Sequence, residues 1–129
     1  MKKAAKKAVK KAAKKTAKRS MAHIKVSAAF REYVLSQLDE LGEVTARAMF
    51  GGVGLYRRGV FFGIVAGDVL YFKVGEANRR DFEKHKAKPF MPYADRASTK
   101  YFAVPVAILE SPADLAAWAR KAIRAAEAA

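Results

Sequence analysis

The sequence contains no cysteine, which excludes disulfide bonds, thiolate metal sites and cysteine nucleophiles. It contains only two histidines, His23 and His85, and they lie far apart along the chain. Two distant histidines without a carboxylate cluster do not form a metal site, so both are interpreted as surface residues. The sequence therefore predicts no metal and no cofactor.

Long apolar runs are also missing. No window reaches the roughly 18 uninterrupted apolar residues that a membrane-spanning helix requires. The charged N-terminus is not followed by a continuous apolar segment, so it does not fit a secretory signal peptide. We therefore expect a soluble, cytoplasmic chain without a membrane partner.

Acidic residues are absent from the first twenty positions. The chain as a whole carries a net charge of +14. Ten of the positive charges fall in this stretch, which leaves about +4 for the remainder. The ten residues are Lys2, Lys3, Lys6, Lys7, Lys10, Lys11, Lys14, Lys15, Lys18 and Arg19. They alternate with small residues in a four-residue repeat, which resembles the lysine–alanine repeats of linker-histone tails.

Residues 1–22 are predicted to be a disordered basic tail, because like charges four residues apart repel each other in a helix. A flexible polycation binds phosphates and releases counterions without reading bases. We therefore predict non-specific binding of the tail to duplex DNA and association with the nucleoid. Two alternatives stay open: the tail only solubilises the chain, or translation begins at Met21.

The rest of the chain, residues 23–129, is predicted to be one domain built around residues 47–74. Turn residues at 51–52, 58–59 and 66–68 divide this stretch into four short apolar runs. Such runs predict consecutive antiparallel strands. Gly59 can supply the positive φ that the turn after Arg57 and Arg58 requires.

Helices are predicted on both sides of these strands. One covers residues 27–41 with Ser27 as its N-cap, and a short polar one runs from about 76 to 86. The last begins at Ser111 and Pro112, with one apolar face and a solvated basic face formed by Arg120, Lys121 and Arg124. Residues 91–93 and 101–104 are predicted to be two short extended segments.

Enzymatic chemistry finds little support in the sequence. The acidic residues are scattered among Lys and Arg, and no pair is spaced for acid–base catalysis. Gly51, Gly52 and Gly54 could be mistaken for a phosphate loop, but such a loop opens a helix and this one opens a strand. The chain is therefore predicted not to be an enzyme.

Basic residues of the domain are candidate DNA contacts. They are Arg57, Arg58, Arg79, Arg80, Lys84, Lys86 and Lys88, with Arg96 and Lys100 as additions. No recognition helix with base-reading side chains is evident, so we expect little sequence specificity. The rings of Phe61, Phe62, Tyr71 and Phe72 could form a stacking platform for single strands, although their apolar neighbours favour core packing.

The ordered pieces of the domain resemble the N-terminal domain of the TfoX/Sxy family of bacterial competence regulators. The matching pieces are Arg47-x-Met49-Phe50-Gly51-Gly52-x-Gly54-Leu55-Tyr56, Phe62-Gly63, Leu70-Tyr71-Phe72-Lys73-Val74-x-Glu76, Pro89-Phe90-x-x-Tyr93, Tyr101-x-x-Val104-Pro105, Leu109-Glu110 and Trp118-Ala119. The resemblance covers about residues 24–127.

The resemblance implies an α+β fold with two layers, an antiparallel sheet with helices packed on one face. The expected order is a helix, three or four strands, a helix, two strands and a helix. Family members act in transcription of DNA-uptake genes alongside the cyclic-AMP receptor protein, which implies a DNA-associated regulatory protein with a transcription-regulator partner. Many carry a second helical domain, and we expect none after the Trp118 helix here. The alternative is an adaptor whose domain binds proteins and does not contact DNA.

Overall fold

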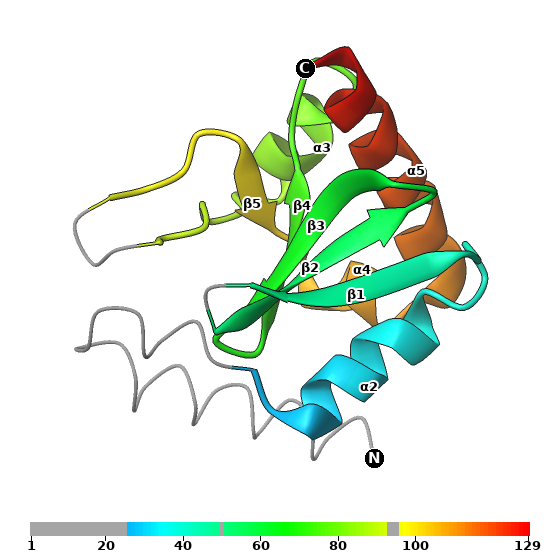
Figure 1. The fold of residues 1–129 in the computed structure, drawn as a ribbon. Helices are drawn as coiled ribbons and strands as arrows, with labels where there is room; N and C mark the ends of the chain where they lie inside the picture. The colour runs from blue at the N-terminus through cyan, green and yellow to red at the C-terminus, as the bar shows by residue number, and fades with distance from the viewer. Residues whose placement is uncertain (1–25, 50, 93–95) are drawn as a thin grey trace.

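The fold is known from a computed structural model, which describes residues 26–49, 51–92 and 96–129. The predicted tail, residues 1–22, lies outside the described residues. The elements, in chain order, are α2 (Ala28–Gln37), β1 (Val44–Met49), β2 (Gly52–Arg57), β3 (Val60–Ala66), β4 (Val69–Lys73), α3 (Arg79–Lys84), β5 (Tyr101–Ala103), α4 (Val106–Leu109) and α5 (Pro112–Ala128). Figure 1 shows their arrangement.

The five strands form one antiparallel sheet in the order β1-β2-β3-β4-β5, so each strand pairs with its neighbours in sequence. Two connections are tight two-residue turns. Arg58 and Gly59 have φ of 49° and 82°, and Gly67 and Asp68 have φ of 56° and 55°. Positive φ at both central residues is the geometry of the type I′ hairpin turn. The four predicted strands and the turn at Gly59 are confirmed.

The core lies between one face of the sheet and the helices. It contains strand residues such as Leu55, Leu70 and Phe72 together with helix residues such as Val34 and Leu115, all at most 1% exposed. Figure 1 shows the strands passing in front of α4 and α5. The α+β class with an antiparallel sheet is confirmed, and the predicted alternation along β4 matches its burial.

Alternation along β3 and β4 divides the four possible platform residues between the two faces of the sheet, and a β-bulge shifts the alternation of β3 at Phe62. Tyr56 lies opposite Phe61 and Leu55 lies opposite Gly63, so Phe62 has no opposite residue. The extra residue turns Phe62 into the core, where it contacts Phe72 at a centroid distance of 5.7 Å. Phe62 and Phe72 are fully buried, so the core packing that the sequence favours is confirmed for these two rings, and they are not available for stacking.

The first helix begins as predicted but ends earlier. The Ser27 hydroxyl accepts a hydrogen bond from the Phe30 N–H at 3.1 Å, as an N-cap should. The helix ends at Gln37 and a turn follows, so Leu38 and Leu41 reach the core from the turn. The Ser27 N–H donates to the buried carboxylate of Asp68 at 2.7 Å, which fastens the start of α2 to the β3–β4 turn.

Helix α5 begins at Pro112 with Ser111 as its N-cap, as the sequence predicts. Its predicted basic face is only partly solvated. Arg120 and Arg124 are exposed, whereas the Lys121 ammonium donates to the Asp81 carboxylate of α3 at 2.9 Å. The ion pair joins α3 to α5, so Lys121 contributes to packing as well as to surface charge.

The predictions for the segment between β4 and α5 need correction. Helix α3 covers Arg79–Lys84 rather than 76–86. Residues 91 and 92 are not in a strand and Tyr93 lies outside the described residues; Pro89 instead forms an isolated bridge with Phe102. Within the described part of this segment there is therefore one strand, β5, where two extended segments are predicted. Helix α4 was not predicted, because its four residues are too few for a periodic pattern.

The buried side chain of Asn78 explains the late start of α3. Its amide oxygen accepts from the Gly75 N–H and its amide nitrogen donates to the Lys73 carbonyl, both at 2.8 Å. We expect Asn78→Ala to lower the free energy of unfolding by about 1–3 kcal/mol, since both backbone groups lose their partner. Urea denaturation measures the change. Asn78→Asp keeps the acceptor but sets a buried carboxylate oxygen against the Lys73 carbonyl, so it should also be destabilising. Equal stability of Asn78→Ala and the unchanged chain would contradict this role.

Candidate nucleic-acid interface

The ten predicted tail contacts, Lys2 to Arg19, lie outside the described residues. The seven predicted contacts of the domain are all described, and they fall into two groups. Arg57 and Arg58 are at the β2–β3 turn. The other five, Arg79, Arg80, Lys84, Lys86 and Lys88, lie on α3 and the segment that follows it.

Arg57 is turned toward its own domain. Its Nε donates to the Gly42 carbonyl at 3.0 Å and its Nη2 to the Leu41 carbonyl at 3.3 Å. These carbonyls lie in the link between α2 and β1, and the Arg57 side chain is only 25% exposed. Arg57 therefore fixes this link against the hairpin and offers little to an external phosphate.

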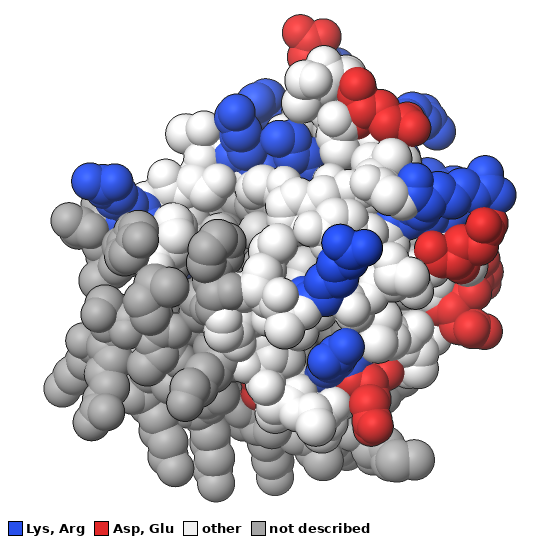
Figure 2. All heavy atoms as spheres, viewed as in Figure 1, with Lys and Arg blue, Asp and Glu red and all other residues white. Residues whose placement is uncertain are grey.

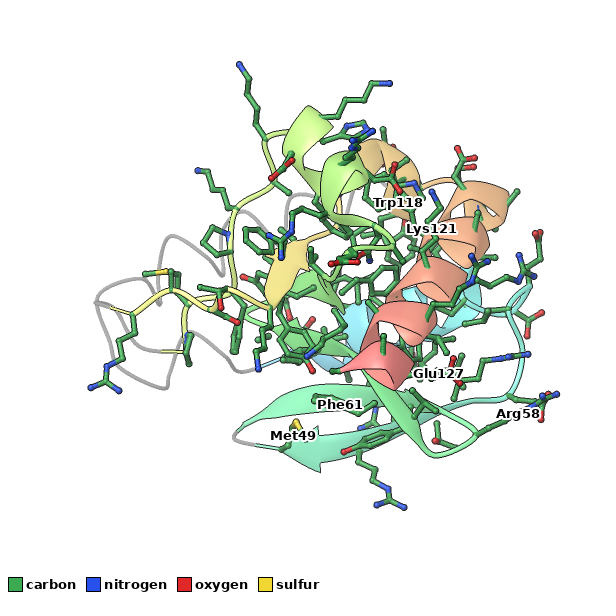
Figure 3. The ribbon with its side chains drawn as sticks, turned by 90° about the horizontal axis from the view of Figure 1, so that it is seen from above. Met49, Arg58, Phe61, Trp118, Lys121 and Glu127 are labelled. Atoms are coloured by element: carbon green, nitrogen blue, oxygen red, sulfur yellow. The ribbon has the colours of Figure 1, made fainter. Side chains whose placement is uncertain are left out.

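Arg58 is more exposed, but its charge is paired with Glu43. Its Nε and Nη2 donate to the Glu43 carboxylate, at 3.1 Å to each oxygen and at 2.7 Å to Oε1 respectively. The hydrogen bonds and charge of Arg58 lower the pKa of Glu43, while Glu43 raises the pKa of Arg58. Figure 3 shows Arg58 at the tip of the hairpin. The two hairpin arginines are therefore weak candidates for DNA contacts.

The five residues Arg79, Arg80, Lys84, Lys86 and Lys88 form what we call the α3 basic surface. All five side chains are exposed, and none forms an ion pair within the part of the chain that the structure describes. Their acidic neighbour Asp81 is held by Lys121. Glu76 and Glu83 are exposed in the same region and reduce the net charge there. The structure thus brings five of the seven predicted domain contacts together.

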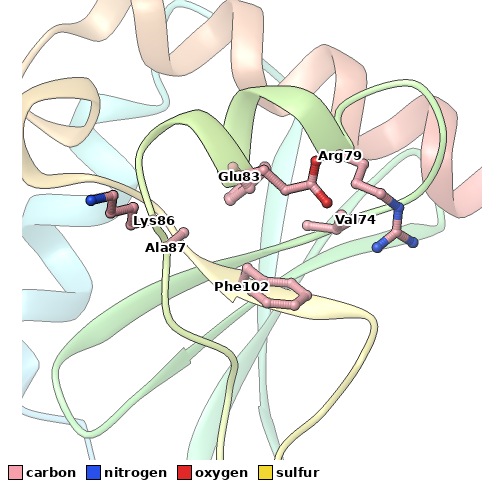
Figure 4. Close-up of a pocket in the computed structure, with 7 residues that line it drawn as sticks. Val74, Arg79, Glu83, Lys86, Ala87 and Phe102 are labelled. Atoms are coloured by element: carbon pink, nitrogen blue, oxygen red, sulfur yellow. The ribbon is translucent and has the colours of Figure 1, made fainter.

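A small pocket lies beside the α3 basic surface (Figure 4). Its volume is about 140 Å³, and Val74, Arg79, Phe82, Glu83, Lys86, Ala87 and Phe102 line it. Pockets for organic ligands usually span roughly 300–1,000 Å³. This pocket is therefore too small for an organic ligand of ordinary size. Arg79 and Lys86 of the α3 basic surface both line it.

Among the described residues, no group of three or more His, Asp or Glu side chains is placed to hold a metal ion. None of the described helices is both long and apolar enough to cross a membrane.

Four charged and aromatic residues of the sheet are not among the contacts predicted from the sequence. Arg47, Tyr56, Lys73 and Tyr101 lie on the sheet face that the helices leave free, beside the predicted Phe61. The alternation within each strand could have grouped them. The order of the strands and the position of the bulge were also needed, and neither can be read from a single strand.

Comparison with models of protein families identifies the family of this domain. Residues 36–126 match the model of the TfoX N-terminal domain family. The matched residues begin in the last turn of α2, contain all five strands and end within α5. A search among curated proteins found no match.

Proposed function

Because the chain belongs to the TfoX N-terminal domain family, we propose that it is a non-enzymatic, DNA-associated regulatory protein of bacteria. Its basic tail binds phosphates without reading sequence, and its domain supplies a regulatory surface. The family match supports a domain like that of the competence regulators. The DNA association rests on one observation, the ten positive charges that residues 2–19 carry without an acidic residue.

The tail provides the larger part of the proposed affinity. Each lysine or arginine that meets a duplex phosphate releases counterions, so binding weakens as salt rises. If about half of the ten charges are engaged, log K falls with log[salt] at a slope near −4 to −5. Binding of this kind keeps the protein on the nucleoid at many sites.

The α3 basic surface provides a secondary contact in this proposal. Its five cations are exposed and unpaired in the described residues, whereas Arg58 already pairs with Glu43. An exposed cation that must first break an ion pair gains less from a phosphate than an unpaired one. The α3 basic surface is therefore preferred over the hairpin arginines.

A second candidate function is an adaptor whose domain binds a transcription regulator and does not touch DNA. It is favoured by the bonds that hold Arg57 and Arg58 within the domain and by the modest charge of the chain beyond the tail. In that case the tail alone concentrates the protein on DNA.

A charge-removal experiment separates the two functions. We expect Arg79→Gln, Arg80→Gln and Lys84→Gln together to make the salt slope of duplex binding shallower by roughly one to two, since each engaged cation contributes about 0.9. Fluorescence anisotropy with a labelled duplex over a salt series measures the slope. The matched control is Arg58→Gln, which removes an exposed but paired arginine and should leave the slope unchanged.

An unchanged slope in the triple variant would favour the adaptor function. Equal effects of the triple variant and Arg58→Gln would contradict the assignment of the contact to the α3 basic surface.

A further inference from the structure

The sheet face turned away from the helices carries three aromatic rings in contact. The Tyr56 and Phe61 centroids are 5.1 Å apart, and the Phe61 and Tyr101 centroids are 5.7 Å apart. We call these three residues the aromatic row. The rings come from β2, β3 and β5 and are tilted by only 32° and 41° to one another. Figure 3 shows Phe61 beside Met49 on the far side of the strands from Trp118 and Lys121 of α5.

The rings of the aromatic row are fixed in place yet partly open. All three side chains are of intermediate exposure, whereas the core rings Phe62 and Phe72 are fully buried. Gly54 makes room for this arrangement. A Cβ there would lie 3.0 Å from the Met49 side chain and 3.1 Å from the Phe61 ring. Because Gly54 has no side chain, Met49 of β1 and Phe61 of β3 can both pack over β2 on this face of the sheet.

A basic side chain lies at each end of the aromatic row. The Arg47 guanidinium is 5.4 Å from the centroid of the Tyr56 ring, and the Lys73 ammonium is 5.3 Å from the centroid of the Tyr101 ring. Cations at this distance from a ring face are attracted to it and held there. Each cation therefore lies against one of the two terminal rings of the aromatic row.

The charge of this face is of one sign. None of the five strands contains an acidic residue, while Arg47 and Lys73 lie on this face. Burial, and then the positive charge of Lys100, lowers the pKa of Lys73. A nearby anion would relieve this repulsion. Figure 2, viewed from the side of the strands, shows separate basic side chains on this surface and acidic ones toward the edges.

A ligand for this face needs flat rings that can stack and negative charges that can reach two cations. The bases of a duplex are already stacked and paired, so their faces are not available. A single strand offers both the faces of its bases and a phosphate at every step. A second aromatic pair, Tyr71 and Phe90 at 5.0 Å, lies on the same face and extends the surface for further bases.

We propose that this sheet face binds single-stranded nucleic acid, with bases stacked on Tyr56, Phe61 and Tyr101 and phosphates on Arg47 and Lys73. None of its residues belongs to the tail or to the α3 basic surface. It adds a preference for unpaired bases to the non-specific phosphate binding proposed above. A protein partner fits this face less well, since covering Arg47 and Lys73 without a counter-charge is unfavourable.

The test uses the full chain and three labelled probes: a thymidine strand of about twelve nucleotides, within the site size of single-strand binding folds, an abasic strand of equal length, and a duplex. The abasic strand keeps the phosphates but has no bases to stack. We expect the thymidine strand to bind at least about fivefold more tightly than the abasic strand. Measurement at about 0.3 M salt weakens the contribution of the tail.

Two matched variants test the rings. In Phe61→Leu with Tyr101→Leu the two strands should bind equally, with duplex affinity unchanged. In Phe61→Tyr with Tyr101→Phe the rings remain, so the preference for the thymidine strand should remain. Thermal unfolding of both variants checks that the fold is kept.

Three results would overturn the proposal. The first is equal binding of the thymidine and abasic strands by the unchanged chain. The second is a preference that survives the leucine variant. The third is a dimer that the leucine variant converts to a monomer, which would assign the face to a second copy of the chain. None of these results affects duplex binding by the tail, so the two proposals fail independently.

Discussion

Deletion of residues 2–19 should remove most of the affinity for duplex DNA and most of its dependence on salt. With about five tail charges engaged, the tail's share alone should weaken binding about 250- to 1,000-fold between roughly 50 mM and 200 mM salt. The tail contributes about −4 to −5 to the slope and the α3 basic surface about −1 to −2, so deletion should change the slope from about −5 to −7 to about −1 to −2. Fluorescence anisotropy with one duplex across the salt series gives both slopes.

The deletion has three informative outcomes. A shallow slope that remains after deletion supports the tail as the main contact and the α3 basic surface as the secondary one. Complete loss of binding supports the adaptor function, in which the domain does not contact DNA. Full retention of binding contradicts the role of the tail. A full-length variant with the ten basic residues changed to glutamine controls for chain length, because it removes the charge and keeps the tail.

Phe72→Ala should cause the largest loss of stability among the substitutions considered, about 3–5 kcal/mol of the free energy of unfolding. Phe72 is fully buried in the core and its ring contacts Phe62. The neighbouring residue on β4, Tyr71, faces the opposite side and is only partly buried. Tyr71→Ala should therefore cost much less, within about 0.5–3 kcal/mol. Urea denaturation of both variants measures the difference.

The comparison tests which face of β4 meets the core. Equal costs for Phe72→Ala and Tyr71→Ala, or a larger cost for Tyr71→Ala, would contradict the assignment of the two faces. If Phe72→Ala does not fold, Phe72→Leu provides a milder change, with an expected cost of roughly 1–3 kcal/mol.

The features of the fold that the sequence predicts are those fixed by local chemistry. Arg58-Gly59 and Gly67-Asp68 specify tight turns because glycine accepts positive φ. Ser27 and Ser111 mark helix starts because a hydroxyl can accept a hydrogen bond from an N–H in the first turn. Alternation along β4 identifies its buried face without knowledge of its neighbours.

The features that the sequence does not predict depend on contacts between distant residues. The bulge at Phe62 shifts the alternation of β3, so a period of two assigns its aromatic residues to the wrong faces. Asn78 delays the start of α3 through hydrogen bonds with Gly75 and Lys73. From the sequence alone Arg58 is interpreted as an unpaired cation, whereas in the folded domain it pairs with Glu43. The sequence thus identifies the charged residues of the candidate site. It does not show which of them form ion pairs in the folded domain.

The sequential order of the sheet has a consequence for folding kinetics. Because each of β1 to β4 pairs with the next strand along the chain, most of the sheet closes only short loops. Contacts between more distant parts of the chain include those of β5 with β4 and of α5 with β3. Since folding rates rise as the sequence separation of contacts falls, the four-strand meander is expected to form as an early unit, with α5 as the element that completes it.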